Sequence, residues 1–310
     1  MDLFFITLEQ MVIMFSFVVV GWGLGKSRLL PDGAAKTLSV LQTNIFFPAM
    51  TFMSLAENLT IDQVADKGVI LLIGIATMFA CIGAAVVLAR LFSKEKAIRN
   101  MYIYFYSFSN FAYLGYPLIK AVFGDDALLD LVVFSIPFNI GISTFGYGLF
   151  QTQNSTPLWK KLLTPLNFSV VLGIIVGLSG IRLPNILSNI FNMSSDCVGI
   201  NAMILTGIVI SEAAIINMFN NKKSYLVSFF RLFGIALVFI PIACLLGIRG
   251  NALICIAVFA AMPGGLNTIV FSVDNDIKSE EPARIITITS LVSIISVPVV
   301  FALMSYLHLI

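Results

Sequence analysis

Two short stretches, SNFAYLGYPL at residues 109–118 and AAMPGGLNTI at residues 260–269, place helix-breaking residues inside long apolar segments. Proline lacks a backbone donor and clashes with the preceding helical turn, and glycine adds backbone freedom. The breakers and the asparagines beside them are Asn110, Gly115 and Pro117 in the first stretch and Pro263, Gly264, Gly265 and Asn267 in the second. We therefore predict two helices that are interrupted near their middles.

The composition places these segments in a lipid bilayer. Hydrophobic residues make up 59% of the 310 residues and charged residues 11%, against about 45–50% and about 25% in soluble domains. The net charge of +2 is too small for a protein that binds the phosphates of nucleic acids. The four cysteines and the single histidine show no metal-binding spacing, so we expect no metal site and no cofactor.

Ten stretches are long and apolar enough to cross the hydrocarbon core as helices, which takes about 20 residues each. They run at about 3–25, 35–56, 68–90, 100–121, 129–151, 164–181, 198–219, 225–247, 251–273 and 284–307. We predict an all-α membrane protein with ten transmembrane helices, of which the fourth and the ninth are the interrupted ones. A separate helix on the membrane surface is expected over 182–197.

Lysines and arginines gather in alternate connections between the spans. Connections after odd-numbered spans hold thirteen of the eighteen basic residues, whereas those after even-numbered spans hold four. Positively charged loops remain in the cytoplasm. The bias predicts a multi-pass protein of the plasma membrane with both chain termini outside the cell.

The number of spans indicates an internal repeat. A unit of five crossings ends on the opposite side of the membrane from its start, so a second copy is inverted. We divide the chain into a first five-helix repeat over residues 1–151, a cytoplasmic linker over 152–163 and a second, inverted repeat over 164–310. Spans 4 and 9 have equivalent positions in the two repeats, and we expect these broken helices to cross near the middle of the membrane.

The two interruptions predict a polar binding site. Backbone groups without helical partners are costly in lipid, so the breaks should face protein or a watery cavity. Amides at the start of a half-helix attract anions, and carbonyls at the end of a half-helix attract cations. Asn110 and Asn267 add uncharged donors and acceptors at the same depth. The prolines of spans 2, 5, 8 and 10 are interpreted as simple kinks.

At these two spans the chain resembles the auxin efflux carrier family, which includes plant PIN-type carriers and bacterial malate and malonate permeases. The matching residues are Asn110, Gly115 and Pro117 with the turn at Phe123-Gly124, then Met262, Pro263, Asn267 and Thr268, and Asn44 with Pro48 in span 2. Residues 272–300 are also similar to the final loop and helix of the family. The likeness covers nearly the whole chain.

The resemblance implies a scaffold that forms a homodimer and a transport domain in which helices 4 and 9 cross. It implies that a substrate, mostly a carboxylate in this family, binds at the crossing and that access alternates by an elevator-like movement. The long hydrophilic loop of plant members is absent between the two halves. The residues that we predict to contact substrate are Asn44, Asn110, Tyr113, Gly115, Pro117, Asn139, Pro263, Gly264, Gly265, Asn267 and Thr268.

Charged residues within the spans are few. Glu212 stands deep in span 7, where a carboxylate either takes up a proton coupled to transport or pairs with Arg231 or Lys222 near the inner interface. We place Arg231 near the start of span 8 and expect no arginine or lysine deep in any span. Full charge pairing with a dianion is therefore not expected, which leaves a monoanion or a bound counter-cation.

Several polar residues in spans 4 and 5 have two interpretations. Tyr102, Tyr104 and Tyr106 are interpreted as an aromatic belt at the cytoplasmic end of span 4. Tyr113 and Tyr116 beside the break either line the site or pack against the scaffold. Asn139, Ser143 and Thr144 in span 5 either form helix–helix hydrogen bonds or contribute to the site.

The leading functional hypothesis is a secondary transporter of small organic anions, mono- or dicarboxylates such as malate or malonate, with H⁺ or Na⁺ as the open choice of coupling ion. The alternative is a passive channel, or an exporter of weak organic acids such as auxin-like indole carboxylates. An enzyme is not indicated, because the sequence has no Ser/His/Asp set, metal motif or paired membrane aspartates. A receptor is disfavoured by the lack of a soluble signalling domain.

Overall fold

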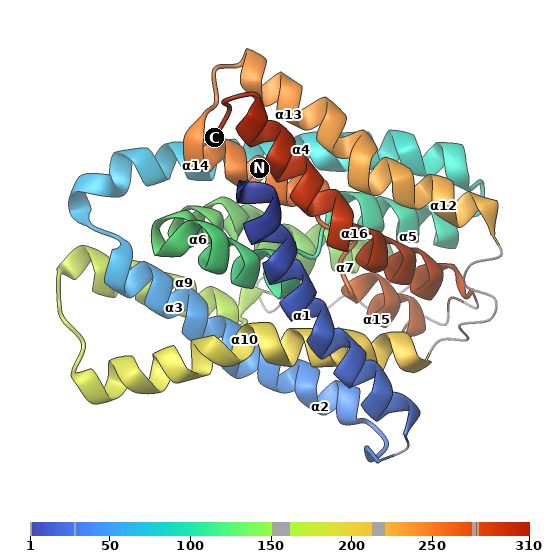
Figure 1. Cartoon of the computed structure of the whole chain (residues 1–310). Helices are drawn as coiled ribbons and strands as arrows, with labels where there is room; N and C mark the ends of the chain where they lie inside the picture. Colours follow the sequence, from blue (N-terminus) through green and yellow to red (C-terminus); the bar gives the residue numbers. More distant parts are fainter. Residues whose placement is uncertain (1, 28, 151–161, 213–220, 275–276, 278) are drawn as a thin grey trace.

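The computed structural model describes residues 2–27, 29–150, 162–212, 221–274, 277 and 279–310. Regular structure in these residues is helical (Figure 1). The α-helices are α1 (Asp2–Lys26), α2 (Ala34–Leu41), α3 (Phe47–Asn58), α4 (Val64–Phe92), α5 (Lys96–Ser107), α6 (Tyr116–Gly141), α7 (Tyr147–Phe150), α9 (Pro165–Ser179), α10 (Asn185–Glu212), α12 (Lys222–Phe229), α13 (Ile235–Leu245), α14 (Gly250–Ala261), α15 (Asn267–Asp274) and α16 (Glu281–Tyr306).

Short helical segments of other types join several of these helices into longer rods. Four are π-helical and one is a 3₁₀ turn: η1 (Gln42–Phe46), η3 (Phe111–Gly115), η4 (Ile142–Gly146), η5 (Phe230–Gly234) and the 3₁₀ turn η2 (Ile61–Gln63). The rod α2–η1–α3 therefore covers the second predicted span, and α12–η5–α13 covers the eighth. π segments often occur at functional sites.

Seven helical segments in the described part of the chain are long and apolar enough to cross a membrane, and the shorter Pro165–Ser179 and Gly250–Ala261 are also apolar. One of the seven, Phe111–Phe150, contains Gly124 with a φ of 84°. This left-handed residue divides α6, so the predicted turn at Phe123-Gly124 is present. The separate surface helix expected over 182–197 is wrong, because no proline or glycine interrupts residues 185–198 and α10 continues through them.

One group of helices, which we name the scaffold body, consists of α1, the rod α2–η1–α3, α9 and α10. In it α1 packs along α10 and α3 packs along α9. Glycines permit both close contacts: a Cβ on Gly21 of α1 would lie 2.1 Å from the carbonyl oxygen of Ile204, and one on Gly177 of α9 would lie 2.5 Å from that of Leu55. Small residues four apart are typical of such contacts between membrane helices.

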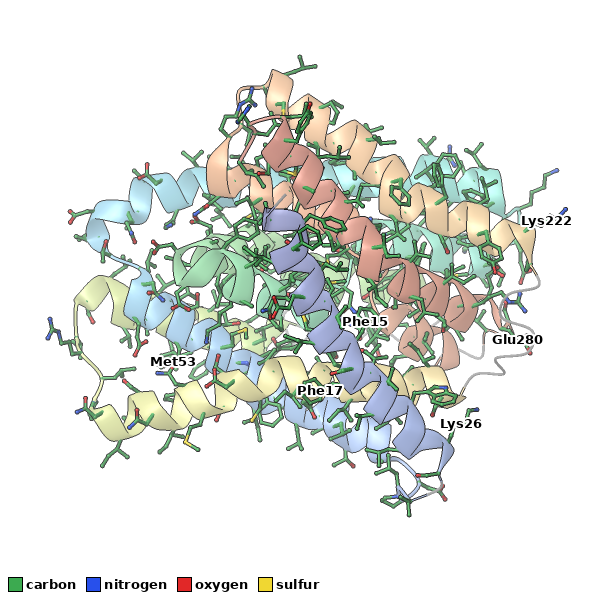
Figure 2. The ribbon with its side chains drawn as sticks, viewed as in Figure 1. Phe15, Phe17, Lys26, Met53, Lys222 and Glu280 are labelled. Atoms are coloured by element: carbon green, nitrogen blue, oxygen red, sulfur yellow. The ribbon has the colours of Figure 1, made fainter. Side chains whose placement is uncertain are left out.

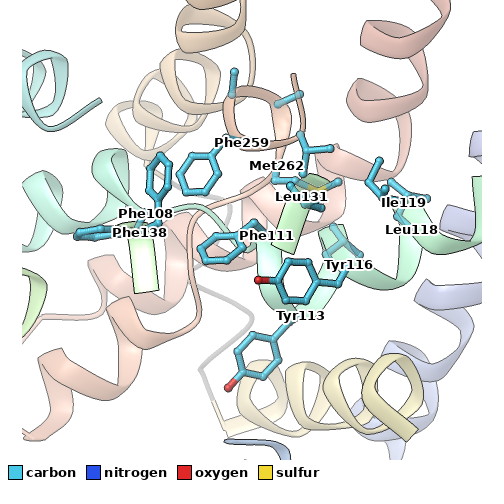
Figure 3. Close-up of a cluster of buried hydrophobic side chains, with 14 of the residues drawn as sticks. Phe108, Phe111, Tyr113, Tyr116, Leu118, Ile119, Leu131, Phe138, Phe259 and Met262 are labelled. Carbon is cyan, nitrogen blue, oxygen red and sulfur yellow. The ribbon is translucent and has the colours of Figure 1, made fainter. Parts of the chain in front are cut away.

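The other helices, α4 to α7 and α12 to α16 with η3, η4 and η5, form what we name the crossing body. Its centre is a cluster of buried aromatic rings from α6, α14 and the segment between α5 and α6 (Figure 3). The ring centroids of Phe138 and Phe259 are 3.5 Å apart, and those of Phe111 and Phe259 are 5.0 Å apart. This close-packed cluster gives the two interrupted helices a rigid support.

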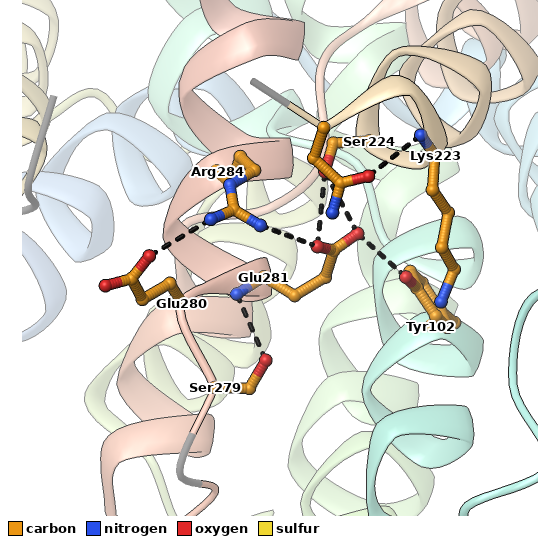
Figure 4. Close-up of polar contacts among 8 residues, drawn as sticks. Tyr102, Lys223, Ser224, Ser279, Glu280, Glu281 and Arg284 are labelled. Carbon is orange, nitrogen blue, oxygen red and sulfur yellow. Dashed lines mark hydrogen bonds and ion pairs between the residues drawn. The ribbon is translucent and has the colours of Figure 1, made fainter. Parts of the chain in front are cut away.

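The aromatic belt predicted at the start of span 4 is wrong. Tyr102, Tyr104 and Tyr106 are all at most 1% exposed, because α5 is enclosed by neighbouring helices of the crossing body. The Tyr102 hydroxyl donates to Glu281 at 2.8 Å (Figure 4), and the Tyr106 hydroxyl donates to the Val227 carbonyl at 3.1 Å. These tyrosines therefore tie α5 to α16 and α12 rather than facing a membrane surface.

The two chain ends lie close together in Figure 1, where α1 begins and α16 ends. Lys26 at the end of α1, Lys222 at the start of α12 and Glu280 before α16 lie at the opposite edge (Figure 2).

Candidate functional site

Both predicted interruptions are present, and they contact each other. Helix α5 ends at Ser107 and η3 starts at Phe111, while α14 ends at Ala261 and α15 starts at Asn267. The backbone amide of Asn110 donates to the Pro263 carbonyl at 2.8 Å, and that of Gly265 donates to the Phe108 carbonyl at 3.1 Å. Ser109 and Gly264 thereby form an antiparallel bridge. Some backbone amides and carbonyls that lose their helical partners at the breaks therefore form hydrogen bonds between the two broken helices.

Gly264 is required by the close approach of the two segments. A Cβ at this position would lie 2.3 Å from two carbons of the Phe105 ring and 3.0 Å from Ile286. Pro263 has no amide hydrogen, so the carbonyl of Phe259 has no donor four residues ahead in the helix. Proline and glycine therefore act together: one ends α14 and the other lets the extended segment pass against α5.

A cavity of about 290 Å³ lies beside this bridge. Its walls come from η1, the two interruptions, the segment joining α6 to η4, and the start of α9. The lining residues are Thr43, Asn44, Phe47, Tyr104, Ser109, Asn110, Phe111, Ala112, Tyr113, Asn139, Ile142, Ser143, Thr164, Pro165, Leu166, Asn167, Gly265, Leu266 and Asn267. None of these residues carries a formal charge, so the cavity offers dipoles rather than ions.

Five asparagines from five different segments share the cavity wall. Asn110 is only 4% exposed, and its Oδ1 atom has no partner among the described residues. Asn44 donates through Nδ2 to the Val40 carbonyl at 2.8 Å, which leaves its own carbonyl oxygen available. Asn267 and Tyr104 both line the cavity, one from the start of α15 and the other from α5. The buried, unpaired Oδ1 atom of Asn110 is costly unless water or a ligand pairs with it.

Helix starts add positive dipole ends at the same place. Segment η3 begins at Phe111, α15 begins at Asn267 and α9 begins at Pro165, and all three residues line the cavity. Amides of a first helical turn have no acceptor within their own helix, and they favour negatively charged groups. Some of these amides are already paired, since Thr268 donates to the Gly265 carbonyl and Asn167 donates to the Thr164 hydroxyl, so what the helix starts offer an anion is mainly their dipoles.

The structure brings six of the predicted substrate residues to the cavity wall, namely Asn44, Asn110, Tyr113, Asn139, Gly265 and Asn267. The other five do not line it. Pro263 and Gly264 belong to the bridge, and Thr268 is fully buried. Gly115 packs against Val258, and a Cβ on Gly115 would lie 3.0 Å from a methyl carbon of that valine. Pro117 instead lies against Gly199 of α10 and lines a second cavity of about 410 Å³.

Sequence reasoning missed several members of the wall. Tyr104, Thr43, Ser109, Thr164 and Asn167 all line the cavity. Asn167 had a readable signal, since Thr164 caps α9 by accepting from the Asn167 amide at 3.1 Å, and Thr-Pro-x-Asn is a typical helix start. Ser143, left open between two roles, lines the cavity as well.

The expectation of no deep basic residue is wrong. Arg231 is 1% exposed and donates from Nη2 to the Phe259 carbonyl at 2.9 Å. It lies nine residues beyond the start of α12, about 13 Å along the axis at 1.5 Å per residue. Glu212 is the last described residue of α10, and its side chain lies outside the described part of the chain.

Comparison with known protein families gives one result that spans nearly the whole chain. A family model described as membrane transport protein matches residues 6–158 and 154–301. The two matched segments meet within the predicted linker at 152–163. No curated protein sequence in the comparison matches the chain.

Proposed function

Because this chain belongs to the family of membrane transport proteins that includes the auxin efflux carriers, we propose that it is a secondary transporter of small organic anions. Mono- and dicarboxylates such as malate or malonate are the proposed substrates. The cavity at the paired helix interruptions carries this proposal, because it combines three helix starts with five asparagines and no charged wall residue. A carboxylate is a suitable ligand for such a set of donors.

The proposed architecture is ten crossings in two inverted five-helix repeats. Contacts within the scaffold body support it, because α1 and α9, the first helices of the two halves, each pack on the second helix of the other half. Both carry glycines four residues apart at that contact, Gly21 with Gly25 and Gly173 with Gly177. A pseudo-twofold relation exchanges these pairs, as inverted repeats require.

The proposed mechanism is alternating access by an elevator-like movement of the crossing body. Apart from the residues of the breaks themselves, the cavity residues lie in the halves of their helices that are nearer to the connections rich in lysine and arginine. Examples are Asn44, Tyr104, Ser143 and Asn167. On the other side of the break, Pro117 packs against Gly199, and Lys120 pairs with Asp196 of α10 at 3.4 Å. This state would be open to the cytoplasm and closed to the outside. The proposed homodimer rests on family resemblance.

Uptake of labelled malate, malonate and acetate into proteoliposomes tests the site. We expect Asn110→Ala and Asn267→Ala to lower the rate by about tenfold or more, because each removes a ligand for a buried anion. Asn58→Ala is the matched control, since Asn58 bonds only the Ser54 carbonyl at the end of α3. Parent-like uptake by both cavity variants would show that the site is wrong.

The same vesicles separate a carrier from a channel. A carrier is accelerated by unlabelled substrate on the opposite side, because its loaded site returns faster than its empty one, whereas a passive pore shows no such exchange. Glu212 stays our candidate for proton coupling. Glu212→Gln should abolish stimulation of uptake by an inward proton gradient while leaving exchange intact.

A further inference from the structure

Arg231 is the largest side chain that is fully buried in the described part of the protein. It belongs to η5, the π segment in the middle of the rod α12–η5–α13. No carboxylate of the described residues forms an ion pair with it. A charged group inside a membrane protein is expensive and usually marks a pathway for ions or substrate.

The contacts of Arg231 coincide with the defect that Pro263 creates. Its Nη2 atom donates to the Phe259 carbonyl at 2.9 Å, and Nη1 lies 3.5 Å from the Ala260 carbonyl. The helical donor for Phe259 would be the amide of residue 263, which proline lacks. The guanidinium therefore occupies the negative end of the half-helix α14, the place where a broken helix would otherwise attract a free cation.

Among the described residues, the groups that surround the guanidinium do not compensate its charge. Its titratable neighbours are the Cys81 thiol of α4 and the Tyr106 hydroxyl of α5, both neutral at physiological pH. Other buried charges of the crossing body have partners: Lys67 pairs with Asp130, which also accepts from Asn251 at 2.8 Å, and Arg284 pairs with Glu281. Arg231 thus adds one positive charge to the interior of the crossing body.

We propose that Arg231 is a resident counter-cation, which replaces a bound metal cation at the end of α14 and makes the crossing body selective for a monovalent anion. This inference rests on the proposed function and narrows its substrates from mono- and dicarboxylates to anions that carry a single negative charge. With the site empty, the described interior of the crossing body carries one positive charge, and a bound monoanion would neutralise it. A dianion would leave a net negative charge, which an apolar membrane disfavours. The proposal therefore predicts uptake that needs no Na⁺.

Two substitutions separate the charge of Arg231 from its hydrogen bonds. Arg231→Gln keeps two N–H donors for the carbonyls but removes the charge, whereas Arg231→Lys keeps the charge. In Na⁺-free proteoliposomes we expect Arg231→Lys to retain most of the uptake of labelled acetate and Arg231→Gln to lose it by about tenfold or more. Arg249→Gln is the control, since exposed Arg249 also donates to backbone carbonyls, those of Cys244 in the last turn of α13 and of Ile248 in the following connection.

A measurement on the purified protein is independent of substrate identity. The melting temperature of the parent should not change when Na⁺ is replaced by N-methylglucamine at equal ionic strength. In a second experiment, added methylguanidinium should raise the melting temperature of Arg231→Ala more than that of Arg249→Ala. Equal uptake by Arg231→Gln and Arg231→Lys, or specific stabilisation of the parent by Na⁺, would overturn the resident cation. If the parent transports no carboxylate, the proposed function is wrong. The melting temperatures then still test whether Arg231 takes the place of a bound cation.

Discussion

Individual side chains at the crossing divide into those that face the cavity and those that hold the helices together. Tyr104 and Tyr102 are one half-turn apart on α5 and differ in this respect. Tyr104 lines the cavity together with Asn267, whereas Tyr102 is outside it and donates to Glu281. Removing the hydroxyl should therefore affect transport at Tyr104 and stability at Tyr102.

We predict that Tyr104→Phe raises the KM for the transported anion by roughly three- to tenfold, because a hydrogen bond in the wall is worth about 0.5–1.5 kcal/mol. The melting temperature should change little. Tyr102→Phe should do the reverse, lowering the melting temperature while the KM stays within twofold of the parent. Uptake kinetics and thermal unfolding of both variants check the pair, and an unchanged KM in Tyr104→Phe would remove Tyr104 from the site.

At the scale of the element, the path of the α14–α15 rod depends on Gly264. We predict that Gly264→Ala destabilises the protein by about 1–3 kcal/mol, because overpacking against the Phe105 ring must displace the bridge. Uptake should fall in parallel. Thermal unfolding and uptake measure the two effects.

The matched control is Gly83→Ala on α4, where a new Cβ meets nothing within 4 Å. There alanine should be neutral or stabilising, since it has the higher helix propensity. A second variant tests the cause: Phe105→Leu together with Gly264→Ala should recover part of the lost stability. If the double variant is as unstable as the sum of the single ones, the clash with Phe105 is not the reason.

At the scale of the whole molecule, transport by an elevator requires the crossing body to move against the scaffold body. Pro117 and Gly199 face each other across this boundary, with a Cβ on Gly199 lying 3.2 Å from that of Pro117. This separation is close to the usual Cβ distance of a disulfide. We predict that Pro117→Cys/Gly199→Cys, made with Cys197→Ser, forms a disulfide that stops uptake.

Reduction with dithiothreitol should restore uptake by the double-cysteine protein, and each single-cysteine variant should transport in both redox states. Accessibility labelling adds an independent readout. A cysteine at Ser143, on the cavity wall, should remain reactive from the side of the 152–163 linker while the disulfide is intact. Undiminished uptake by the oxidised double variant would contradict a movement between the two bodies.

Local features of the chain were accessible from the sequence. The described parts of the ten apolar stretches are helical except at some ends and at the two interruptions, and both interruptions are present because Pro263, Gly264 and Asn110 act through their own backbone chemistry. The glycine pairs on α1 and α9 were not predicted, although small residues four apart are typical of close contacts between membrane helices. The separate surface helix predicted over 182–197 is wrong because, after Pro184, no helix breaker separates its residues from the rest of α10.

Long-range partnerships were decided by the tertiary structure. Nothing in the periodicity indicates that Asn44, Asn139 and Asn167 meet Asn110 and Asn267 at one cavity. Nor does it show that Arg231 reaches the carbonyls left open by Pro263. Helix formation depends on interactions between residues a few positions apart, which the sequence displays, whereas these sites depend on which faces of distant helices pack together. The sequence alone therefore determined helices and breaks, and only packing decided which polar groups share a site.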